Sequence, residues 1–97
     1  MKTTQAWFDT EIEPEAMAQP GFRALERGET ELAGLRGIRW TWHRRPDSAP
    51  ATTVHERIAA YERTWYRIRI EASTLEFERS RHAIEQWIRS LEIAPPY

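Results

Sequence analysis

The chain has 97 residues, enough for one domain and too few for two. It contains no cysteine, which excludes disulfides, thiolate metal sites and thiol catalysis. No segment approaches the ~18 apolar residues of a transmembrane helix, and the first residues lack the apolar core of a signal peptide. We therefore expect a cytoplasmic protein that does not contact membranes.

The net charge of −1 hides a separation of charge along the chain. Residues 1–35 carry three basic and seven acidic side chains, whereas residues 36–69 carry eight arginines and three acidic side chains. Residues 70–97 carry three basic and five acidic ones. Such a chain is expected to self-associate as a homodimer or to fold its acidic segment onto its own basic middle. It lacks the uniformly basic character that is usual for a nucleic-acid binder.

An acidic arm is predicted over residues 1–21, ahead of the domain. Trp7 and Phe8 lie among acidic side chains, Pro14 suits the first turn of a short helix, and Pro20 with the glycine after it ends that helix. Two roles are open for this arm. Its apolar side chains either cover the chain's own core or dock as aromatic anchors into a partner or a second copy of the chain.

Residues 22–97 are expected to form a single α+β domain. It begins with at most two helical turns over residues 22–27, after which Gly28 suits the position just past a helix end. The alternation over residues 38–43 then predicts a half-buried strand, with apolar side chains on one side and polar ones on the other. Residues 44–50 contain two prolines and are predicted to form a loop.

A helix is predicted over residues 54–64. Thr53 and Glu56 fit a capping box, in which a hydroxyl and a carboxylate satisfy the first amides of a helix. Apolar residues then recur at helical spacing: Val54, Ile58, Tyr61 and Trp65.

A β-hairpin is predicted over residues 66–72 and 75–78, which alternate between apolar and polar side chains. Ser80 would cap a helix over residues 81–91, and residues 93–97 would form a tail or a short edge strand. The side chains of the hairpin that are expected to face the core are Tyr66, Ile68, Ile70, Leu75 and Phe77.

This order predicts a βαββα, ferredoxin-like α+β fold: a small antiparallel sheet of three to four strands with both helices on one face. The alternative is an antiparallel meander in which residues 52–61 form a strand and a single helix, 81–91, backs the sheet. The capping box favours the first fold.

In the favoured fold the polar sides of the strands form an open face. Arginines from the strands and from the following loop would gather there into a guanidinium cluster that binds an acidic protein surface or a phosphate backbone. With the two aromatic anchors of the arm, the predicted partner-binding residues are Arg39, His43, Arg44, Arg45, Arg67, Arg69, Trp7 and Phe8.

No motif in the sequence predicts catalysis, a cofactor or a metal ion. The three histidines lack metal-ligand spacing, and nucleophile-elbow, phosphate-loop and dinucleotide motifs are missing. We therefore predict a small non-enzymatic protein-binding module: a subunit, adaptor or inhibitor, such as a phage or plasmid accessory protein that acts on nucleic-acid machinery. The first alternative is direct nucleic-acid binding by the arginine face. The second is a small enzyme whose site forms between subunits.

Overall fold

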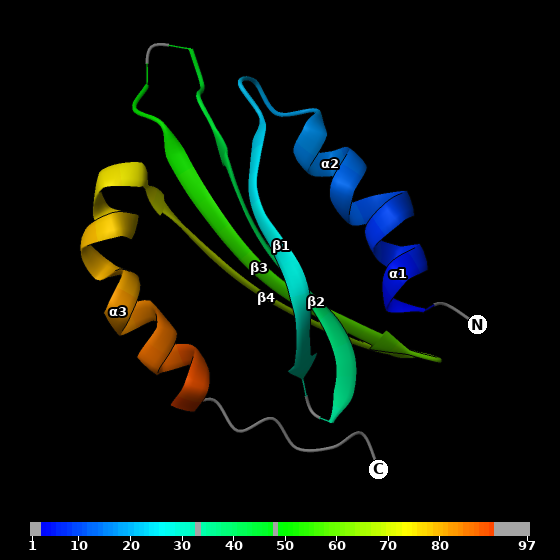
Figure 1. The fold of residues 1–97 in the computed structure, drawn as a ribbon. Coiled ribbons are helices and arrows are strands. Elements are labelled where there is room, and N and C mark those ends of the chain that lie inside the picture. Colours follow the sequence, from blue (N-terminus) through cyan, green and yellow to red (C-terminus); the bar gives the residue numbers. More distant parts are fainter. Residues whose placement is uncertain (1–2, 33, 48, 91–97) are drawn as a thin grey trace.

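A four-stranded antiparallel sheet lies between two helical layers in the computed structural model, which describes residues 3–32, 34–47 and 49–90 (Figure 1). The strands follow one another across the sheet: β1 (Arg23–Leu32), β2 (Leu35–Arg44), β3 (Thr52–Tyr61) and β4 (Thr64–Ser73). On one side lies the amino-terminal helix, made of α1 (Thr4–Trp7), the π-helical turn η1 (Phe8–Ile12) and α2 (Glu13–Met17). On the other lies α3 (Thr74–Ser90).

The βαββα prediction is wrong, and the meander alternative describes the sheet. Residues 52–61 are strand β3, which pairs with β2 on one side and β4 on the other. Glu56 does not cap a helix, because its side chain is buried and binds the indoles of β2. The helices cover opposite faces of the sheet, so the prediction of both on one face is also corrected (Figure 1).

The segment 22–27, predicted to be helical, instead belongs to β1, and the register shifts between Ala24 and Glu26. Gly28 lies in the middle of this strand, where a Cβ atom would come within 2.8 Å of the Arg39 guanidinium. The glycine therefore leaves room for the Arg39 side chain to cross β1 and pair with Glu26.

Helix α3 begins at Thr74, earlier than the predicted start at residue 81, and it absorbs the segment 75–78 that was predicted to be a strand. The amide of Glu76 donates to the Ser73 hydroxyl, which caps the helix, and the Thr74 amide donates to the Ala51 carbonyl. The tail predicted over residues 93–97 lies outside the described residues. Among the residues that are described, no helix is long and apolar enough to span a membrane.

The main core lies between the sheet and the amino-terminal helix. Phe8 is fully buried, and its ring lies edge-on to Trp40, with 4.8 Å between the ring centroids. The predicted strand over 38–43 is confirmed, since its isoleucine and tryptophans point into this core. We call this side of the sheet the amino-terminal face; its buried residues are Ile38, Trp40, Trp42, Val54, Glu56, Ile58 and Ala60.

Strand β4 faces the opposite way from the prediction. Arg67 and Arg69 pair across the ladder with Ile58 and Glu56, which places both arginines on the amino-terminal face. The isoleucines Ile68 and Ile70 therefore lie on the other side, the α3 face, opposite Arg57 and His55 of β3. The buried Glu56 accounts for this polarity, because a carboxylate in an apolar layer requires cations beside it.

Candidate functional site

The arginine cluster predicted from the sequence is divided between the two faces of the sheet. Arg39 lies on the α3 face, paired with Glu26, whereas Arg67 and Arg69 lie on the amino-terminal face. Arg44 pairs with Glu71.

Of the other predicted residues, His43 is half-buried on β2 and Arg45 is exposed just after the strand. The aromatic anchors Trp7 and Phe8 are both buried in the core of their own chain. The arm therefore takes the first of its two predicted roles, that of covering the core. It brings its acidic side chains with it: Glu15 lies 3.7 Å from Arg67 and 3.6 Å from Arg69.

A buried ion network holds the arginines of β4. Glu56 is 1% exposed, and its Oε1 accepts hydrogen bonds from Nε and Nη2 of Arg67 at 3.0 and 2.5 Å. Its Oε2 accepts from the indole nitrogens of Trp40 at 2.9 Å and Trp42 at 3.4 Å. Both carboxylate oxygens are thus occupied by donors of the same chain. Arg67 and Arg69, which were predicted to bind a partner, therefore neutralise the buried Glu56 carboxylate of their own chain.

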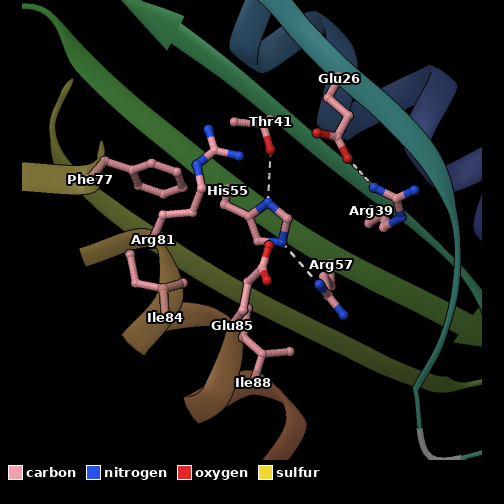
Figure 2. A pocket seen from close by; sticks show the side chains of 10 residues that line it. All are labelled: Glu26, Arg39, Thr41, His55, Arg57, Phe77, Arg81, Ile84, Glu85 and Ile88. Carbon is pink, nitrogen blue, oxygen red and sulfur yellow. Dashed lines mark hydrogen bonds and ion pairs between the residues drawn. The ribbon is translucent and has the colours of Figure 1, made fainter. Parts of the chain in front are cut away.

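A cavity of about 60 Å³, lined by both charged and apolar side chains, lies on the α3 face, between the sheet and α3 (Figure 2). His55 lies at its centre and is 9% exposed. Figure 2 shows the charged side chains that surround the imidazole: one acid and two arginines from the strands, and one of each from α3. These residues are Glu26, Arg39, Arg57, Arg81 and Glu85.

The hydrogen bonds of His55 fix its protonation. Arg57 Nε donates to His55 Nε2 at 3.1 Å, so Nε2 carries no proton. Nδ1 lies 2.8 Å from the Thr41 hydroxyl and is the protonated nitrogen of a neutral ring. Burial lowers the pKa of His55 below its ordinary 6.5, and the charge of Arg57 lowers it further, although Glu26 and Glu85 oppose this effect.

This cavity is poorly suited to a substrate. Its volume of about 60 Å³ is well below the several hundred Å³ of small-molecule sites. The three arginines of its lining are already engaged: Arg39 with Glu26, Arg81 with Glu78, and Arg57 with the imidazole. The cluster is arranged to hold a neutral histidine under a helix.

A second hollow opens on the amino-terminal face and is about 710 Å³ in volume. The start of the amino-terminal helix (Thr3–Gln5) forms one wall, and the middle of β1 (27–29) forms another. The ends of β2 (35–38) and β3 (60–61) complete it. More of its lining is apolar than polar, and Tyr61 at its margin is 54% exposed.

This cleft exists because β2 and β3 separate at one end. Their ladder ends with the pair Gly37 and Ala59, and the next pair would be Arg36 with Ala60. The Thr4 hydroxyl stands between these two residues instead: it accepts from the Ala60 amide at 2.9 Å and lies 3.0 Å from the Arg36 carbonyl oxygen. The helix start is thus wedged between two strands that have parted.

The sequence carries a weak signal for the cavity under α3 and none for the cleft. His55 was assigned to the first turn of a helix, so its burial under α3 was missed. Only the alternation of Thr53, His55 and Arg57 with Val54 and Ile58, which Glu56 interrupts, could have placed it on a strand face. The cleft had no signal, because strand separation depends on where a distant helix lands. Within the described part of the chain, no three side chains gather as metal ligands.

The comparisons with known proteins bear on the fold. No family model and no curated protein matches this chain. A similar fold is found in the Pseudomonas aeruginosa crystal structure named "Protein of Unknown Function PA94 from Pseudomonas aeruginosa, Putative Regulator". It superposes with a TM-score of 0.79 at 11% sequence identity, over 94% of this chain and 62% of its own. The present chain therefore shares the fold of that protein and spans about three fifths of its length.

Proposed function

We propose that this chain is a non-enzymatic protein-binding module, a subunit, adaptor or inhibitor, which binds a segment of its partner in the cleft between α1, β1, β2 and β3. The observation that carries the proposal is the contrast between the two hollows. The cleft is open, mostly apolar and about 710 Å³ in volume, whereas the cavity under α3 is only about 60 Å³ and the arginines that line it are held by partners within the chain.

The surroundings of the cleft support protein binding. Tyr61 and Trp65, on either side of the β3–β4 turn, are 54% and 43% exposed. Trp65 is also held in place, because its ring packs edge-on against buried Trp7 with 5.0 Å between centroids. Rigid aromatic side chains beside an apolar hollow are typical anchors of protein interfaces, since they bury large areas at a small cost in side-chain entropy.

Nucleic-acid binding by the arginine face has less support. Arg44, Arg67 and Arg69 each have a carboxylate within 4 Å, so their charges are neutralised inside the molecule. A phosphate backbone would have to compete with these carboxylates for contacts with the three arginines. The proposed partner is therefore a protein.

Selection from a peptide library tests the proposal. A random peptide library displayed on phage would be panned against the immobilised full chain, and the enriched peptides would be synthesised. We expect a Tyr61→Ala variant to bind these peptides at least about tenfold more weakly, because truncated interface anchors commonly cost more than 1 kcal/mol. Fluorescence anisotropy measures the affinities.

The matched control is Leu75→Ala, which removes a 61% exposed apolar side chain on α3, outside the cleft. Ala60→Arg, which places a long side chain in the cleft, is the second variant, and its circular dichroism spectrum would show whether it folds. Peptides that bind wild type, Tyr61→Ala and Ala60→Arg equally, or a library with no enrichment, would remove the proposal.

A further inference from the structure

The separated ends of β2 and β3 leave strand backbone facing the cleft. In an antiparallel strand the N–H and C=O of one residue point to the same neighbouring strand. The carbonyl of Arg36 points into the gap, where it meets Thr4, so the amide of Arg36 faces the gap as well. The amide of Ala60 faces it from the other side.

The Thr4 hydroxyl is the side-chain group that forms hydrogen bonds with the backbone on both sides of this gap. Thr4 Oγ1 lies 3.0 Å from the Arg36 carbonyl oxygen and 3.2 Å from that of Ala60. A hydroxyl has one proton and can donate fully to only one of them at a time. The other carbonyl can therefore accept an N–H from an incoming backbone, and an extended segment presents such groups at the spacing of a strand.

Three of the described charged residues line the cleft: Arg27, Glu29 and Arg36, all of them exposed. Arg27 is engaged, because its guanidinium lies 4.2 Å from the centre of the Phe8 ring and 4.0 Å from Glu13. Arg36 is exposed and has no carboxylate within 4 Å among the described residues, although it faces Glu31 across the β1–β2 ladder. A cation at the margin of an apolar hollow attracts an acidic group that stands next to an apolar one.

We infer that the segment bound in the cleft is extended and pairs an apolar side chain, directed toward Ile38 and Ala60, with a neighbouring acidic side chain that contacts Arg36. This inference rests on the proposed function, since it names the chemistry of the segment that the module binds.

Three labelled hexapeptides test the charge requirement. They share one alternating valine- and threonine-rich sequence and differ at one position, which holds glutamate, glutamine or lysine. We expect the glutamate peptide to bind the full chain about tenfold more tightly than the lysine peptide, and Arg36→Glu to reverse this order. Because the contact is at the surface, the preference should shrink as salt rises from about 50 to about 500 mM.

The matched control is Arg45→Glu, which changes an exposed arginine that does not line this cleft and should keep the glutamate preference. A fourth peptide, methylated at its central backbone nitrogens, should bind at least about fivefold more weakly if the backbone is extended and hydrogen-bonded.

The outcomes separate the two proposals. If the peptides bind and Tyr61→Ala weakens them, but Arg36→Glu leaves the charge preference unchanged, the inference is wrong and the protein-binding function stands. Unchanged affinity of the methylated peptide would also overturn the extended segment. If library selection also yields nothing that depends on the cleft, both proposals fall.

Discussion

The two faces of this sheet are closed by helices in different ways. The amino-terminal helix buries Trp7, Phe8, Ile12 and Ala16 against an apolar layer that contains one charge, Glu56, with both oxygens paired. On the other face, α3 buries Phe77 and Ile88 over a polar chain of Thr41, His55 and Arg57 and leaves a cavity of about 60 Å³. The amino-terminal face should therefore contribute most of the free energy of unfolding. The α3 face should contribute less, and its contribution should depend more on pH.

Removing the buried carboxylate should have the largest effect. Glu56→Ala leaves the Arg67 guanidinium beside an apolar layer and two indole N–H groups without their acceptor. The loss of the acceptor of two buried indole N–H groups, together with the loss of the ion pair, should cost about 3–5 kcal/mol of unfolding free energy. Urea denaturation measures it. The control is Glu76→Ala, which removes an exposed acid on α3 paired with Arg79 and should cost well under about 1 kcal/mol. Equal losses in the two variants would contradict the network's role.

Truncating one phenylalanine on each face compares the two layers directly. Phe8→Ala should cost about 3–5 kcal/mol, because the ring is fully buried between Trp40 and Arg27. Phe77→Ala should cost about 2–3 kcal/mol, since that ring already borders a cavity and loses fewer contacts. The same urea measurements give both values. The reverse order would mean that α3 holds the fold together more than the amino-terminal helix does.

The smallest effect is a pH dependence from the α3 face. The pKa of His55 is lowered in the folded protein, so the unfolded chain binds more protons at acidic pH. The stability that His55 contributes is present above its ordinary pKa of 6.5 and is lost as the pH falls through the lowered folded pKa. One proton limits this slope to about 1.4 kcal/mol per pH unit.

Urea midpoints measured at several pH values check this expectation. His55→Gln should reduce the loss of stability below pH 6.5, whereas His82→Gln, an exposed position on α3, should leave it in place. A slope that survives His55→Gln unchanged would place the pH sensitivity elsewhere.

Local alternation predicted the strands over residues 38–43 and 66–72, which lie in β2 and β4, but it also placed residues 75–78 in a strand. Residues 38–43 alternate with large apolar side chains on one side, and one orientation buries them all. Residues 52–61 satisfy both the period of a strand and, through Thr53 and Glu56, a helix cap, so the local pattern could not decide between them. Phe77 alternates with Leu75 as in a strand, and it also lies at helical spacing from Ile84 and Ile88. The cap at Ser73 starts the helix before this segment, so residues 75–78 are helical.

The sequence by itself determined that this is an α+β chain with an acidic beginning and a basic middle, because alternation and charge are read from neighbouring residues. It left open whether the acidic arm covers its own core or binds a partner, and the structure shows that the arm packs on its own sheet. Tertiary structure alone decided which side of β4 faces the core. A carboxylate from β3 became buried there, and the cations that could neutralise it lay on the polar side of the neighbouring strand. It also decided where the cleft opens, since the gap between Arg36 and Ala60 is held apart by Thr4, more than thirty residues away in the chain.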